Sequence, residues 1–188
     1  MLKKRQSESK DSDFLYDGSS GELYAKGVGQ DKTDHLGFAL QKKKFTPYLK
    51  MEDKVLDFGC GNGALAREIK PYVRELEGLE VNSFSRDIAE TEMGLKVYAE
   101  LSDIPENKKY DVIYTNHVLE HLPDVANTLK QLSFHLKKNG RLLIVVPAED
   151  FRSSPQKEWS VEDPDYHLHT WTPRLMANSL RLAGYQPN

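Results

Sequence analysis

Short apolar runs alternate with helix-forming stretches through most of this 188-residue chain, and this alternation constrains the fold more than any other feature. Parallel strands need a long crossover connection, which a helix usually supplies. The chain therefore predicts an α/β domain, a Rossmann-like parallel sheet with helices on both faces. The expected strands are 54–58, 75–81, 95–99, 110–116 and 141–147. The expected helices are 63–72, 84–93, 118–138 and 174–185, and we expect the third of these to be interrupted at Pro123.

The region before the first strand divides into two segments. Residues 1–20 are polar, of mixed charge and punctuated by Gly and Ser, which favours a flexible leader. Residues 21–50 have a glycine-broken first half and an apolar second half, so we expect a cap or lid segment with a short helix that ends before Pro47. Residues 51–188 form the expected core domain.

Composition disfavours several classes of function. Lys and Arg number 26 against 29 Asp and Glu, so no overall basic field is present to hold nucleic acid. The single cysteine cannot form an internal disulfide, and the chain begins without a secretory signal. No apolar run approaches the roughly 18 residues of a membrane span. We therefore expect a cytoplasmic protein that acts on a small molecule, with neither a nucleic-acid nor a membrane partner.

Three glycines in VLDFGCGNG (55–63) lie between the first strand and the first core helix. Glycine permits a tight turn and lets a ligand approach main-chain N–H groups. A dinucleotide loop is one interpretation, but the carboxylate of Asp57 would repel a pyrophosphate and attract an ammonium group. Glu80, at the end of the second strand, has the spacing of a ribose-hydroxyl acceptor. A zwitterion with a free ribose diol describes S-adenosylmethionine better than NAD.

Four motifs in order resemble the class I S-adenosylmethionine-dependent methyltransferases of the small-molecule branch: VLDFGCGNG, LEGLEV, YDVIYTNHVLEHLPD and GRLLIVVP. The resemblance implies S-adenosylmethionine as cofactor and O- or N-methylation of a sugar, lipid precursor or secondary metabolite. The family's usual Gly-Asp pair after the third strand is absent, and Leu101 is the candidate for packing on the adenine ring. The cofactor-binding residues so implied are Tyr24, Asp57, Gly59, Cys60, Gly61, Gly63, Glu80, Leu101, Asn116 and His117.

Histidines are the candidate catalytic bases. A hydroxyl acceptor must lose a proton, and an imidazole with a pKa of about 6.5 suits that task. His167 and His169 lie in a long connection, 148–171, at the sheet edge where α/β proteins bind ligands. His121, after the fourth strand, is the third candidate.

Two alternatives stay open at this point. His117, Glu120 and His121 spell H-x-x-E-H, the pattern of inverted zinc peptidases. We expect His117 at the bend after the fourth strand, pointing differently from His121, so the sequence predicts no metal site and leaves a zinc-dependent hydrolase as a minor alternative. The other alternative is a non-catalytic, cofactor-binding partner subunit.

The C-terminal part of the expected fold is short. The resembling family usually has seven strands, and strands 6 and 7 are expected to be missing here, which leaves 141–147 as an apolar edge strand. We expect either an incomplete chain or an edge covered by another chain, for example in a homodimer.

Overall fold

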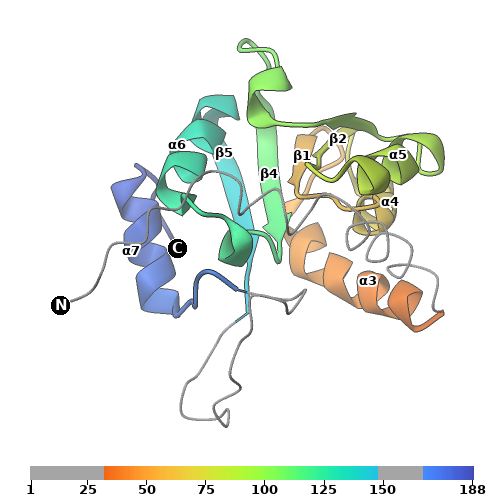
Figure 1. The fold of residues 1–188 in the computed structure, drawn as a ribbon. Helices are drawn as coiled ribbons and strands as arrows, with labels where there is room; N and C mark the ends of the chain where they lie inside the picture. The colour runs from red at the N-terminus through yellow and green to blue at the C-terminus, as the bar shows by residue number, and fades with distance from the viewer. Residues whose placement is uncertain (1–31, 148–166) are drawn as a thin grey trace, which may run out of the picture.

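The computed structural model describes residues 32–147 and 167–188. Within this part of the chain, no helix is long and apolar enough to cross a membrane. The helices and strands, shown in Figure 1, are α3 (Lys32–Phe45), β1 (Lys54–Phe58), α4 (Ala64–Ile69), β2 (Glu75–Leu79), α5 (Ser83–Thr91), β3 (Lys96–Tyr98), β4 (Tyr110–Asn116), α6 (Val125–His135), β5 (Leu136–Val145) and α7 (Pro173–Leu182). Short 3₁₀ turns are η1 (Thr46–Tyr48), η2 (Lys70–Tyr72), η3 (Leu101–Asp103) and η4 (Leu119–His121).

The described strands form one parallel sheet in the order β3-β2-β1-β4-β5. The chain moves outward from β1 to β3 and then returns to place β4 on the other side of β1. Such a reversal opens a crevice at the carboxyl ends of the two central strands, where α/β proteins bind ligands. The predicted Rossmann-like sheet of five parallel strands is confirmed.

Alternate residues of the strands feed two apolar layers, because successive side chains of a strand point to opposite faces. Val55 packs in one layer with Ile69 of α4, and Leu56 packs in the other with Leu129 of α6. In Figure 1 the helices α3, α4 and α5 lie on one side of the sheet and α6 and α7 on the other. Both faces are therefore covered, as expected.

The helix predicted over 118–138 is wrong at both ends. The chain instead forms the 3₁₀ turn η4, and α6 begins only after Asp124, whose side chain accepts a hydrogen bond from the Asn127 amide at 3.0 Å. Pro123 cannot donate a main-chain hydrogen bond, so it separates the turn from the helix. At the other end α6 stops at His135, and β5 begins at Leu136 rather than at residue 141.

Helix α3 lies within the predicted cap segment and packs directly on the core. Phe45 is buried, and Lys42 forms a 2.8 Å ion pair with Glu68 of α4. The predicted leader (1–20) and Tyr24 lie outside the described residues. Strand β5 occupies the edge of the sheet next to β4, as expected. The homodimer that would cover it stays a prediction.

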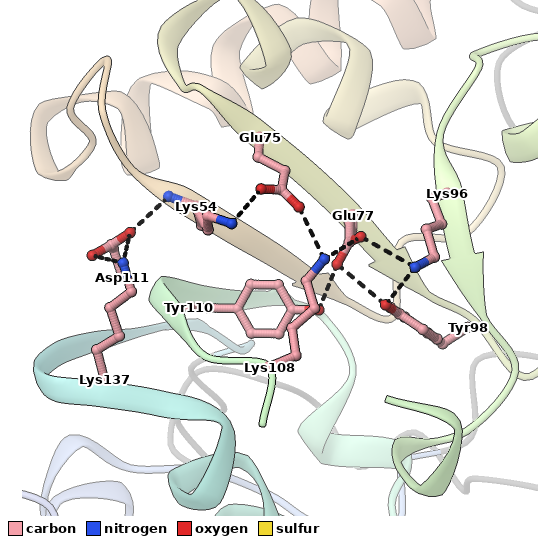
Figure 2. Close-up of polar contacts among 9 residues, drawn as sticks. All are labelled: Lys54, Glu75, Glu77, Lys96, Tyr98, Lys108, Tyr110, Asp111 and Lys137. Atoms are coloured by element: carbon pink, nitrogen blue, oxygen red, sulfur yellow. Dashed lines mark hydrogen bonds and ion pairs between the residues drawn. The ribbon is translucent and has the colours of Figure 1, made fainter. Parts of the chain in front are cut away.

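A network of lysines and carboxylates ties together the amino ends of the strands (Figure 2). Lys108 Nζ lies 2.9 Å from Glu75 Oε1 and 2.6 Å from Glu77 Oε1, and the Tyr110 hydroxyl donates to Glu77 Oε2 at 2.7 Å. Burial alone would raise the pKa of Glu77, but the hydrogen bonds from Lys108 and Tyr110 outweigh it and lower that pKa. The network stabilises the end of the sheet opposite the crevice.

Candidate active site

The glycine loop turns sharply at the carboxyl end of β1 and is fastened to β2. The amides of Gly59 and Cys60 both donate to the carbonyl of Leu79, at 2.8 and 3.0 Å. Gly59 has a φ of +79°, and a Cβ there would lie 2.3 Å from a methyl carbon of Val118, so only glycine fits. Gly61 also has a positive φ, +54°, but among the described residues no atom other than those of Gly61 and its chain neighbours lies within 4 Å of where its Cβ would be. The loop therefore leaves open space above Gly61.

Glu80 faces this loop from the end of β2. Its Oε2 accepts a hydrogen bond from the Gly61 amide at 2.9 Å, and its Oε1 accepts one from the Asn82 amide at 2.8 Å. Burial raises the pKa of Glu80, while the two amides act in the opposite direction. The two N–H groups fix both carboxylate oxygens in position. A carboxylate held in this way fits the role of acceptor for the two hydroxyls of a ribose.

Asp57 is buried beneath the loop, with 2% of its surface exposed. It lies beside Tyr114 in the β1–β4 pairing, and the Tyr114 hydroxyl donates to Asp57 Oδ2 at 2.6 Å. Burial raises the pKa of Asp57 to about 7; the hydrogen bond from Tyr114 opposes this, and the nearby charge of Glu80 adds to it. An added positive charge near the loop would favour the ionised form of Asp57. Sequence reasoning missed Tyr114, which only the pairing of β1 with β4 identifies.

Cys60 contributes packing to the loop. Its side chain is buried, and a Cβ on Gly78 of β2 would lie 2.5 Å from its Sγ. Burial raises the pKa of the thiol, so the cysteine is not an activated nucleophile. Its amide donates to Leu79, and its carbonyl accepts from the Gly63 amide at 3.0 Å. Both main-chain groups of Cys60 are therefore already paired within the protein. The cofactor contact implied for Cys60 stays a prediction.

Asn116 and His117 lie at the carboxyl end of β4, next to the glycine loop. Asn116 Nδ2 donates to Gln41 Oε1 of α3 at 3.0 Å, and among the described residues its buried Oδ1 has no hydrogen-bond partner. His117 adopts a φ of +58°, and its amide donates to the Val145 carbonyl at 2.9 Å. This left-handed residue makes the expected bend after the strand. Gln41 was not predicted, since nothing in the sequence places α3 beside β4.

The predicted bases come from two segments that meet beside η4. The amides of Leu168 and His169 donate to the carbonyl of Glu120, at 2.8 and 3.1 Å. The rings of His121 and His167 then stand edge to face with centroids 5.0 Å apart. The His169 ring instead contacts Trp171, with centroids 5.8 Å apart, and its Nε2 lies 2.8 Å from the Leu122 carbonyl. The structure therefore brings His121 and His167 together and holds His169 by a main-chain contact.

Leu101 and Gly63 complete the described part of the predicted set. Leu101 begins η3, directly after β3, and is half-buried against the α6 side of the core. Gly63 precedes α4 with a φ of +79°. The predicted cofactor contacts at Leu101 and Tyr24 stay predictions, and Tyr24 lies outside the described residues.

Comparison with known proteins identifies the class. The sequence profile of a family described as a methyltransferase domain matches residues 33–187. The match covers most of the chain, which therefore belongs to the class I S-adenosylmethionine-dependent methyltransferases and uses S-adenosylmethionine as its cofactor, as the four motifs predicted.

Two relatives are named as a methyltransferase and a carboxymethyltransferase. A ubiquinone biosynthesis O-methyltransferase of Rickettsia canadensis (strain McKiel) is 29% identical over 97 residues, which are 48% of this chain and 41% of the relative. A tRNA U34 carboxymethyltransferase of Aliarcobacter butzleri (strain RM4018) is 30% identical over 158 residues, 74% of this chain and 50% of the relative. The chain thus spans half or less of these relatives' length.

A solved structure resembles this fold over most of the chain. The crystal structure of an S-adenosylmethionine-dependent methyltransferase from Thermotoga maritima, described as a possible histamine N-methyltransferase, has a TM-score of 0.72 at 18% identity. The likeness covers 94% of this chain and 82% of that one, and it shows the fold.

Proposed function

We propose that this protein transfers a methyl group from S-adenosylmethionine to a hydroxyl or amine of a small molecule. The observation that carries the proposal is the pairing of Glu80, fixed by two amides, with the open space above Gly61. Glu80 would hold the ribose, and buried Asp57 would attract the positively charged end of the cofactor. When bound, S-adenosylmethionine supplies an electrophilic methyl group on a sulfonium, and methyl transfer leaves a neutral thioether.

The remaining task of the protein is to align the acceptor and remove its proton. His121 and His167 lie together beyond the carboxyl end of β4. An imidazole nitrogen of either would take the proton of an acceptor hydroxyl while the hydroxyl oxygen bonds to the methyl carbon. His169 is the less favoured candidate base, since its Nε2 already contacts the Leu122 carbonyl. The Asn116–Gln41 contact brings α3 to the same edge of the sheet.

A small-molecule acceptor is supported by the chain's charge and by one relative. The formal net charge of −3 gives no overall attraction for a polyanion. The Rickettsia canadensis relative is named as an O-methyltransferase of ubiquinone biosynthesis. The tRNA U34 carboxymethyltransferase relative favours a second candidate, an RNA acceptor, and covers more of this chain.

Cofactor binding is the first test. We expect calorimetric titration of the full chain with S-adenosylhomocysteine to show one site, and Glu80→Gln to weaken binding at least about tenfold, because an amide can accept from the ribose through one oxygen only. Glu92→Gln, an exposed position just after α5, is the matched control and should bind like the wild type. Equal affinity for Glu80→Gln and wild type would contradict the assigned cofactor site.

Methyl transfer is the second test. The chain is supplied with S-adenosylmethionine carrying a labelled methyl group, with a metabolite extract in one arm and total tRNA in the other. Label in the metabolite arm supports the proposal, and label only in tRNA would establish the RNA alternative. Cofactor binding with no transfer in either arm would favour the partner-subunit alternative. His121→Asn and His167→Asn should lower kcat with cofactor affinity unchanged, by roughly a hundredfold for whichever is the base.

A further inference from the structure

A buried carboxylate, that of Glu120, lies in η4, shortly after the end of β4. Glu120 has 0% of its surface exposed, and neither of its side-chain oxygens has a hydrogen-bond partner among the described residues. Isolated burial of an ionised carboxylate is strongly unfavourable unless a cation or a set of donors compensates it. The His117 ring lies beside it, with Nδ1 3.3 Å from Glu120 Oε1. A positive charge bound beside Glu120 would therefore be favourable.

Two more metal-binding side chains surround this carboxylate. One ligand atom from each of Glu120, His121 and His167 lies within 4.8 Å of the others. Ligand atoms bound at about 2.0–2.1 Å in a tetrahedral zinc site lie about 3.3–3.4 Å apart. The cluster is wider than this spacing, so the three side chains would have to move closer together around a bound ion.

The backbone holds the cluster in place. Glu120 and His121 are consecutive in η4, and the amides of Leu168 and His169 are anchored on the Glu120 carbonyl, which fixes the neighbouring His167. His117 stands on the open side, with its side chain about half exposed. Its left-handed backbone is the kind of strained conformation that persists at functional sites.

We propose that Glu120, His121 and His167 bind a divalent transition-metal ion, with His117 next to the open coordination position. Two imidazoles and one carboxylate are the donor set of catalytic zinc sites and also suit manganese or iron. This differs from the peptidase pattern of the same sequence, because His117 precedes η4 and the third ligand comes from the distant segment that begins after residue 166. The metal site does not depend on methyl transfer. If the proposed function also holds, the ion would lie on the acceptor side and bind an acceptor oxygen, and His121 and His167 would then act as its ligands instead of as a free base.

Metal binding is tested on the full chain, stripped with a chelator, dialysed and titrated with Zn²⁺ and with Mn²⁺. We expect one ion per chain, and at least a tenfold loss of affinity in Glu120→Gln and in His167→Asn. The matched control is His135→Asn, since the His135 ring contacts the Lys108 carbonyl near the opposite end of α6. Absence of Zn²⁺ and Mn²⁺ binding by the wild type, or full binding by both cluster variants, would overturn the proposal.

Thermal unfolding separates a metal ligand from a structural residue. Glu120→Gln removes a buried charge, so without metal it should melt at or above the wild-type temperature, while losing the rise in Tm that Zn²⁺ gives the wild type. A Zn²⁺-induced rise that survives in this variant would contradict the assignment. His167→Asn provides the same comparison from the other segment should Glu120→Gln not fold. S-adenosylhomocysteine should bind both variants normally, so a failed metal site leaves the cofactor assignment intact.

Discussion

Replacing Asp57 by Asn should stabilise the cofactor-free protein at neutral pH while weakening cofactor binding. The carboxyl is buried, and burial raises its pKa from the ordinary value of 3.8 to about 7. An Asn side chain is neutral and nearly isosteric, and its Oδ1 can still accept the hydrogen bond that the Tyr114 hydroxyl now gives to Asp57. The substitution therefore removes the cost of a buried charge with little change in packing.

The sign follows from proton linkage. Because the folded-state pKa of Asp57 is raised, the folded protein keeps a proton that the unfolded chain has already lost between about pH 4 and pH 7. Wild-type stability therefore falls as the pH rises through that window. The full difference in pKa corresponds to about 4 kcal/mol, of which about 3 kcal/mol falls between pH 5 and pH 8. Asp57→Asn lacks this loss, so its advantage over the wild type should grow with pH.

Urea unfolding at pH 5 and pH 8 measures the effect. With equal m-values, the free energy of unfolding of Asp57→Asn relative to wild type should rise by about 3 kcal/mol between the two pH values. Glu75→Gln is the contrasting control. Hydrogen bonds from Lys108 and Lys54 lower the pKa of Glu75 to about 2, and its side chain is a third exposed. Its substitution should therefore cost about 1 kcal/mol or less at both pH values.

The same variant must also bind the cofactor poorly. At pH 8, S-adenosylhomocysteine should bind Asp57→Asn at least about tenfold more weakly than the wild type, since the ammonium group loses a negative partner. Wild-type affinity should increase as the pH rises through 7, as Asp57 ionises. A variant that is less stable than wild type at pH 8 would refute the assigned charge state, and one that binds as tightly would refute the role in binding.

Three further substitutions test the contributions of the glycine loop, helix α3 and the lysine–carboxylate network to the free energy of unfolding. Gly59→Ala should lower the free energy of unfolding by at least about 2 kcal/mol in urea titrations, because a left-handed alanine would also press against Val118. Gly37 lies in α3, and among the described residues a Cβ added there would meet no atom within 4 Å beyond its chain neighbours and the backbone of the helix itself, so Gly37→Ala should instead raise the free energy of unfolding by up to about 1 kcal/mol. Lys108→Met should lower it by about 3 kcal/mol, since Glu77 would keep a buried charge, while calorimetry shows unchanged S-adenosylhomocysteine affinity.

Strands were predicted well because each is bounded by strong local signals. The strands at 54–58 and 110–116 match their predicted ranges, since apolar runs there end in a glycine turn or at Asn116. The segment after β4 was predicted poorly. The break at Pro123 was predicted, but apolar periodicity favoured helix on both sides of it, whereas the structure has a 3₁₀ turn before Pro123 and a helix that ends at His135. Local breaking signals outweighed periodicity at this position.

The site was predictable only where its residues share one motif. Asp57, Gly59 and Glu80 follow from the spacing within the first βαβ unit. Tyr114 could not be found in the same way, because its contact with Asp57 depends on the β1–β4 register. The meeting of His121 with His167 also escapes any local pattern. It depends on main-chain hydrogen bonds to the Glu120 carbonyl from a segment distant in the sequence.

The lysine–carboxylate network at the amino ends of the strands has an evolutionary consequence. Lys108 and its partners Glu75 and Glu77 secure the sheet at the end opposite the crevice (Figure 2). Substitutions among the acceptor-side residues therefore do not weaken these ion pairs. A directed-evolution library confined to residues at the carboxyl ends of the strands should therefore leave these contacts, and their contribution to folding, unchanged.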